Sequence, residues 1–152
     1  MYMWMSPQTW IWPWILCSML RPSASASATP VKSLLVHRDA AERFLPRLKE
    51  KLEEKQVEIR GDEASRAVVP EFAAASEEDW GKEYLDYILS CKIVDSVDEA
   101  IRHINRYNTG HSECIVTRDY EASQRFLDEV DAAAVYVNAS TRLPMGLSSA
   151  SV

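Results

Sequence analysis

The middle of this chain alternates between short apolar runs and longer amphipathic runs, and this alternation limits the folds that it can adopt. The short runs have the length and apolar content of β-strands, and they cover residues 33–37, 57–60, 84–94, 113–117 and 133–137. Amphipathic segments with helical spacing lie between them. Strands that alternate with helices favour crossover connections and a mostly parallel sheet. We therefore expect an α/β fold with helices flanking the sheet.

The first two expected helices are marked by caps, spacing and prolines. Asp39 is a candidate N-cap, and it precedes apolar residues at helical spacing: Ala41, Phe44, Leu45, Leu48 and Leu52. Pro46 lies inside this run and implies a kink or a late helix start. A short helix is expected over 62–69, closed by Pro70.

Two further helices follow from capping signals. Ser96 and Glu99 form the S-x-x-E pattern of a capping box, ahead of an apolar stripe made by Val97, Ala100, Ile101 and Ile104. Asp119 is expected to open the last helix, whose apolar face would carry Ala122, Phe126, Leu127 and Val130.

Composition excludes several classes of function. The formal net charge is −6 and the pI is about 5.1, whereas a general nucleic-acid binder usually carries a basic face. The 4 glycines cannot be arranged as GxGxxG or GxxxxGK[ST], so a glycine-rich phosphate loop is excluded. The 3 cysteines lack CxxC spacing and His37, His103 and His111 lack paired ligand spacing, so neither a disulfide framework nor a metal site is expected. Unpaired cysteines fit a reducing compartment.

The two ends of the chain differ from its middle. All 23 acidic residues lie between Asp39 and Asp131, while the first 20 residues carry no charge and hold four of the 5 tryptophans and four of the 5 methionines. The apolar run Trp10–Leu20 is followed by small residues, Ser23–Ala26, as in a signal peptide. However, no positive charge precedes Arg21, and prolines interrupt the run. A signal or membrane anchor is therefore the weaker of two explanations.

From Ser33 onward the residues closely resemble the gamma-glutamyl phosphate reductases, also called glutamate-5-semialdehyde dehydrogenases, of the aldehyde dehydrogenase superfamily. The blocks EEDWG, INRYNTGHSE and VYVNASTR carry the resemblance, which covers about residues 31–142. A full family member is considerably longer and has a nucleotide-binding domain, a catalytic domain and an oligomerisation arm. The resemblance therefore implies a partial catalytic domain of the aldehyde-dehydrogenase type.

The resemblance also implies a reaction and its setting. The family reduces L-glutamyl 5-phosphate to L-glutamate 5-semialdehyde with NADPH, in proline biosynthesis. A cysteine thiolate attacks the acyl phosphate, phosphate leaves, and hydride reduces the thioester. The resemblance implies a cytoplasmic homo-oligomer that acts on a small molecule, with no nucleic-acid or membrane partner. The cofactor domain should lie upstream of the matched segment, so most of the NADPH site would be absent from this chain.

The chain departs from the family where the nucleophile belongs. The family has a Val-Cys-Asn-Ala-like stretch shortly before LLVH, whereas this chain reads Ser27-Ala28-Thr29-Pro30. The codons TCT GCA ACG CCG, preceded by one G, read GTC TGC AAC GCC in the shifted frame, which encodes Val-Cys-Asn-Ala. The chain as written therefore has no expected catalytic residue.

A shifted reading frame also accounts for the unusual ends. Methionine and tryptophan have single codons, which become valine and aspartate codons when the frame moves. Recoded in this way, both ends resemble the segments that flank the matched block in the family. We expect an out-of-frame segment at 1–30, a partial catalytic domain at 31–142 and an aberrant tail at 143–152.

Five residues are the candidate site residues. Glu78, in EEDWG, matches the superfamily glutamate that contacts the nicotinamide ribose hydroxyls, although Glu77 and Glu78 could instead be first-turn acids of a helix. Candidate substrate-carboxylate ligands follow the last expected strand, because α/β sites lie at the carboxyl ends of parallel strands: Asn138, Ser140, Thr141 and Arg142. A polar loop is the alternative there. Cys91 and Cys114 lie in apolar strands and are expected to be buried.

Two alternatives to a catalytic fragment stay open. The chain could be a non-enzymatic α/β module with an N-terminal apolar signal or membrane anchor. It could also be a fragment that assembles with a separately encoded partner.

Overall fold

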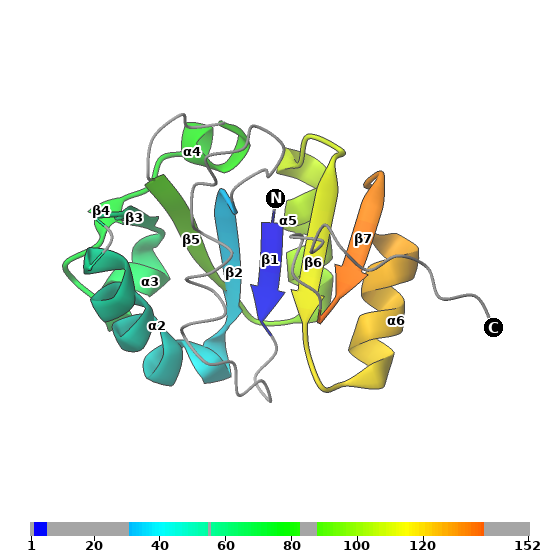
Figure 1. Ribbon diagram of the computed structural model, residues 1–152, viewed down its shortest axis with the longest axis horizontal. Coiled ribbons are helices and arrows are strands. Elements are labelled where there is room, and N and C mark those ends of the chain that lie inside the picture. The colour runs from blue at the N-terminus through cyan, green and yellow to red at the C-terminus, as the bar shows by residue number, and fades with distance from the viewer. Residues whose placement is uncertain (1, 6–30, 55, 83–87, 139–152) are drawn as a thin grey trace, which may run out of the picture.

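The computed structural model describes residues 2–5, 31–54, 56–82 and 88–138 (Figure 1). Each apolar run expected to be a strand overlaps with one, and positions 84–87 of the expected strand 84–94 lie outside the described residues. These strands are β2 (Ser33–His37), β3 (Glu58–Gly61), β5 (Ile88–Val94), β6 (Ser112–Val116) and β7 (Ala134–Val137). Two further strands, β1 (Tyr2–Met5) and β4 (Ala73–Ala74), were not predicted. The expected α/β fold is confirmed.

The strands form one 7-stranded sheet in the order β4-β3-β5-β2-β1-β6-β7, and every neighbouring pair is parallel. β1 lies between β2 and β6, with Tyr2 opposite both Ser33 and Glu113. Residues 2–5 therefore belong to the sheet, whereas the sequence analysis assigned residues 1–30 to an out-of-frame segment and expected no strand there. The run Trp10–Leu20 lies outside the described residues.

Helices cover both faces of the sheet, as expected for parallel strands. On one face, α2 (Arg38–Glu53) and α3 (Glu63–Val68) enclose a core that contains Leu34, Leu45 and Leu48. On the other face, α5 (Val97–Tyr107) and α6 (Tyr120–Glu129) enclose a core that contains Leu35, Ile104 and Phe126. Figure 1 shows α4 (Glu77–Gly81) beyond the end of the sheet where the strands begin.

A capping side chain starts each of the four longer helices where a strand ends. His37, Asp62, Ser96 and Asp119 accept backbone N–H bonds at the start of α2, α3, α5 and α6. Each cap satisfies a donor that the first helical turn leaves without an intrahelical partner. The predicted caps Ser96 and Asp119 are thus confirmed.

Two details of the helix prediction are wrong, and one of the two alternatives given for Pro46 is excluded. The N-cap of α2 is His37, whose Nδ1 accepts the Asp39 N–H at 3.1 Å, so Asp39 already lies in the first turn. The helix begins at Arg38 and runs through Pro46 without a late start. Leu127 is 39% exposed, because the buried stripe of α6 narrows to Ala122 and Phe126, with Val130 buried just past its end.

Candidate functional site

The candidate cofactor residue Glu78 lies in α4, at the amino edge of the sheet (Figure 1). Two contacts place the helix there. Ser90, near the start of β5, donates its hydroxyl to the backbone carbonyl of Asp79 at 3.2 Å. Tyr107, the last residue of α5, donates its hydroxyl to the carboxylate of Glu77. Because α5 runs back from the carboxyl end of β5, its last turn also lies at the amino edge.

Asp79 anchors α4 to the sheet through its buried carboxylate. Oδ1 accepts a bond from Arg60 of β3 at 2.9 Å, and Oδ2 accepts the Ser76 backbone N–H at 2.6 Å. Burial by itself would raise the pKa of Asp79, but the bonds from Ser76 and Arg60 outweigh it and lower that pKa. Asp79 is therefore an ionised, paired structural acid.

An aromatic stack holds the other side of α4. Trp80, which is 7% exposed, meets the ring of His103 edge-on with centroids 5.3 Å apart. His103 in turn lies 4.7 Å from the ring of Tyr107. Burial, followed by the charge of Lys92, lowers the pKa of His103 to about 4, so this imidazole is neutral near pH 7.

Glu78 itself is exposed, unlike Asp79 and Trp80 beside it. Within the described ranges no hydrogen bond or ion pair engages its carboxylate, while Glu77 contacts Tyr107 and Asp79 contacts Arg60. A carboxylate in this position can accept two hydrogen bonds from a diol. The position fits the expected contact with ribose hydroxyls, and it also fits a solvated first-turn acid.

The candidate substrate residues lie at the opposite edge of the sheet. Asn138 follows the carboxyl end of β7 with a φ of 52°, and its side-chain amide pairs with the backbone of Thr117 in both directions, at 2.9 and 2.8 Å. Ser140, Thr141 and Arg142 lie outside the described residues. The structure thus does not bring Asn138 and Glu78 together. The Asn138 amide instead links the end of β7 to the end of β6 through its bonds with Thr117.

A shallow hollow of about 400 Å³ adjoins Asn138 at this carboxyl edge. Its lining comes from the end of β7 and the start of α6: Thr117, Arg118, Asp119, Tyr120, Ser123, Val137 and Asn138. The Asp119 carboxylate faces the helix start as its cap, accepting the Ala122 N–H at 3.1 Å. That cap occupies the position at which a helix N-terminus would receive an anion.

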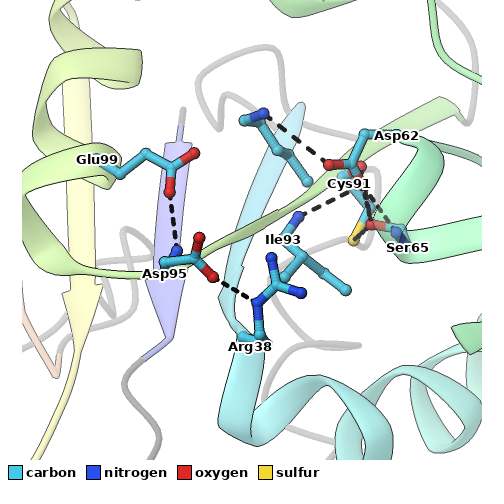
Figure 2. A network of polar contacts seen from close by, with 8 residues as sticks. Arg38, Asp62, Ser65, Cys91, Ile93, Asp95 and Glu99 are labelled. Carbon is cyan, nitrogen blue, oxygen red and sulfur yellow. Dashed lines mark hydrogen bonds and ion pairs between the residues drawn. The ribbon is translucent and has the colours of Figure 1, made fainter. Parts of the chain in front are cut away.

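The carboxyl ends of β2, β3 and β5 carry a network of polar contacts with a capping role (Figure 2). Asp62 accepts both the Ser65 N–H at 2.9 Å and the Ser65 hydroxyl at 2.5 Å, and Lys92 lies 3.9 Å from its other oxygen. Arg38 binds the Asp95 carboxylate, and the Asp95 N–H donates to Glu99 at 2.9 Å. These contacts join the helix starts to the strand ends.

The described cysteines do not form a nucleophilic site. Cys91 and Cys114 are both buried in strands, as expected. Burial raises the pKa of the Cys91 thiol to about 12, although the Ser65 hydroxyl opposes this rise, so the thiolate is not populated near neutral pH. Among the described residues, no three His, Cys, Asp or Glu side chains are grouped so that they could hold a metal ion. No helix in the described ranges is long and apolar enough to cross a membrane.

The sequence analysis did not identify three residues of the α4 environment. Arg60, Asp79 and Tyr107 are brought together from β3, α4 and α5 by tertiary folding. Tyr107 lies in the INRYNTGHSE block, which supported the family resemblance, but the sequence assigned no function to this tyrosine.

The parallel sheet, its two helical layers and the acid-bearing helix at its amino edge define a segment of an α/β protein. A profile of the aldehyde dehydrogenase family matches residues 70–148, and the chain belongs to this family. The match extends past residue 142, where the sequence analysis placed the end of the catalytic segment.

Within the family, the chain is similar to gamma-glutamyl phosphate reductases. It is 57% identical over 115 residues to that of Lachnospira eligens, an alignment that covers 76% of this chain and 28% of the relative. It is 56% identical over 126 residues to that of Petrotoga mobilis, covering 83% and 29%. The chain thus spans under a third of the length of these relatives.

Solved structures agree with this likeness. The gamma-glutamyl phosphate reductase from Thermotoga maritima superimposes with a TM-score of 0.84 and 42% identity, over 93% of this chain and 34% of that one. A lactaldehyde dehydrogenase superimposes with a TM-score of 0.68 at 13% identity, over 95% and 39%, which shows the shared fold.

Membership in the aldehyde dehydrogenase family implies a nicotinamide cofactor. The exposed Glu78 carboxylate suits the hydroxyl groups of such a ligand. The phosphate groups of the cofactor need hydrogen-bond donors, which the acidic side chains of α4 do not supply. The side chains of α4 therefore fit the ribose hydroxyl groups of the cofactor and not its phosphates.

Proposed function

We propose that this chain is part of the catalytic domain of a gamma-glutamyl phosphate reductase, which reduces L-glutamyl 5-phosphate to L-glutamate 5-semialdehyde in proline biosynthesis. The identity of 57% to a named reductase over 115 residues carries this proposal. The substrate is a small acyl phosphate. We further propose a cytoplasmic enzyme that is homo-oligomeric when intact.

The proposed cofactor is NADPH, which supplies the hydride that reduces the acyl group. Glu78 would bind the ribose hydroxyls next to the nicotinamide. Its exposure at the amino edge supports this role, and so does its position in the EEDWG block. Most of the cofactor's contacts would come from a domain outside the segment that matches these relatives.

The reaction needs a cysteine nucleophile close to the start of β2. Val31 and Lys32, the residues before β2, are 3% and 7% exposed, and the chain enters β2 at the same amino edge that carries α4. A nucleophile just upstream would therefore approach the sheet at the Glu78 edge. Since residues 27–30 read Ser-Ala-Thr-Pro, we propose that the chain as written is inactive.

We propose that residues 1–30 and 143–152 are translated out of frame and that 31–142 is the catalytic segment. Four residues remain substrate-site candidates: Asn138, Ser140, Thr141 and Arg142. The paired amide of Asn138 supports a role in holding the end of β7 against Thr117, the residue after β6. The nucleotide sequence tests the frame directly, because a shifted frame must encode Cys-Asn-Ala beside codon 28.

Transplantation tests the activity. In the intact Lachnospira eligens reductase, residues 31–138 of this chain would replace the aligned segment, leaving the relative's own cysteine and cofactor domain in place. The chimera is expected to form the semialdehyde with NADPH, while the 152-residue chain is expected to be inactive. A folded chimera without reductase activity would contradict the proposal.

A further inference from the structure

α4 cannot set its own orientation, because it contains only 5 residues. Helices this short are unstable without tertiary contacts. The direction in which Glu78 points therefore depends on the side chains that tie α4 to the rest of the domain.

Those ties lie on both sides of Glu78. Successive helical residues are rotated by about 100° around the axis, so Glu77 and Asp79 flank Glu78 on the helix surface. Arg60 holds Asp79 at 2.9 Å, and Tyr107 holds Glu77 through its hydroxyl. Because both neighbours are held, α4 is fixed in a single orientation about its own axis. In that orientation the Glu78 carboxylate is exposed.

The Glu77 side of this arrangement rests on the end of α5. Arg106 lies 3.8 Å from the Glu77 carboxylate, and its guanidinium is 5.1 Å from the centre of the Tyr107 ring. The helix beneath is well anchored, because Ile101 and Ile104 are 4% and 0% exposed and Asn108 donates to the Asp131 carbonyl at 2.8 Å. Tyr107 thus presents its hydroxyl from a rigid platform.

We propose that Tyr107 is a positioning residue for Glu78: by binding Glu77 it fixes the rotation of α4 and aims the Glu78 carboxylate at the ligand. This inference rests on the proposed binding of ribose hydroxyls by Glu78. Tyr107 itself touches neither cofactor nor substrate in this assignment.

The test uses the chimeric enzyme described above, with KM for NADPH and kcat measured separately. Glu78→Gln is expected to raise KM about tenfold, and Tyr107→Phe about threefold, because a misdirected carboxylate loses part of its binding. Glu77→Ala, which removes the acceptor of the Tyr107 hydroxyl, should reproduce Tyr107→Phe. Tyr136→Phe removes one hydroxyl from the half-buried edge strand β7 and is the matched control, with no expected change.

The double variant separates positioning from a general structural role. If Tyr107 acts through Glu78, then Tyr107→Phe should not raise KM further in the Glu78→Gln background. An equal rise in both backgrounds would overturn the inference, and so would an unchanged KM in Tyr107→Phe while Glu78→Gln is impaired. If Glu78→Gln itself has no effect, the proposed role of Glu78 fails and the inference falls with it. The same substitutions at the aligned positions of the unmodified relative give the answer if the chimera does not fold.

Discussion

His103 is a buried base whose protonation opposes folding. Only 8% of the residue is exposed, and the rings of Trp80 and Tyr107 lie against it. Burial, with the charge of Lys92 as the next cause, lowers its pKa from 6.5 to about 4. As the pH falls, His103 therefore binds a proton near pH 6.5 in the unfolded chain but only near pH 4 in the folded chain.

The free energy of unfolding should consequently fall as the pH falls through this window and stay level above it. The limiting slope for one proton is about 1.4 kcal/mol per pH unit. Urea unfolding of the chain between about pH 7.5 and pH 5 measures it, before most carboxylates titrate. His103→Phe should flatten the curve, whereas His111→Phe, at an exposed position, should leave it sloping. A slope that survives in His103→Phe would contradict the assignment.

Asp79 shows a linkage of the same sign with a different cause, because here the fold stabilises the charged form of the group. Its pKa is lowered in the folded state, so its contribution to stability is present above its ordinary value of 3.8 and is lost as the pH falls below it. Asp79→Asn should cost about 1–3 kcal/mol near pH 7, because Arg60 and the Ser76 N–H lose a charged partner. Asp128→Asn makes the same change at an exposed position of α6 and should be neutral in the same unfolding assay. Equal stabilities of the two variants would count against the buried ion pair.

At the scale of single elements, α2 and α6 test which apolar residues face the core. Leu48 is fully buried in α2, while Leu127 is 39% exposed on α6, although the sequence pattern placed both on an apolar face. Leu48→Ala should destabilise the chain by about 2–5 kcal/mol, since it removes buried methyl groups and leaves a cavity. Leu127→Ala should cost well under that amount. Chemical denaturation of the two variants compares them, and similar losses would show that Leu127 is buried in solution.

The elements that could be predicted from the sequence are those long enough to show a period or a cap. The stripe of α5 and its Ser96 cap, and the Asp119 cap of α6, are examples. β4 has 2 residues and α4 has 5. These elements are too short to show the alternating pattern of a strand or the spacing of apolar residues along a helix. Glu78 was predicted through the EEDWG block, whereas the partners that hold its helix, Arg60 and Tyr107, come together only through tertiary folding.

The N-cap of α2 shows a different limit. His37 is the last residue of β2 and still caps the helix with its ring nitrogen, so strand and helix share a boundary without a connecting loop. Preference for aspartate at N-caps favoured Asp39, two residues too late. The strand itself was predicted at its observed bounds, 33–37, so the error concerns the cap alone, because histidine is not among the preferred N-cap residues.

At the scale of the whole molecule, the carboxyl ends and the amino ends of the strands carry different features. The carboxyl edge is committed to starting helices, with His37, Asp62, Ser96 and Asp119 as caps. The amino edge carries α4, the exposed Glu78 and the entry of the chain into β2. Of the four candidates expected at the carboxyl ends, Asn138 lies within the described residues and its amide is already paired, while Ser140, Thr141 and Arg142 lie outside them.

The continuity of this sheet depends on β1. Residues 2–5 lie between β2 and β6, and Met3 is opposite Leu34 on one side and Cys114 on the other. Their place in a parallel sheet is held by backbone hydrogen bonds, which any residue except proline can donate. This explains how a segment that the sequence analysis did not predict as a strand can occupy a central position in the sheet.

Proline at position 3 should therefore break the sheet at its centre. Met3→Pro removes a backbone N–H that donates to a neighbouring strand from the interior of the sheet. We expect a loss of about 3 kcal/mol or more, as for proline in the interior of a helix. Met3→Val keeps the N–H and has good strand propensity, so it is the matched control. Hydrogen exchange of the β2 and β6 amides should accelerate in Met3→Pro but not in Met3→Val, since among the described strands β1 is the one that pairs with both β2 and β6. Equal protection in both variants would mean that β2 and β6 are held without β1, and the sheet order at the centre would then be wrong.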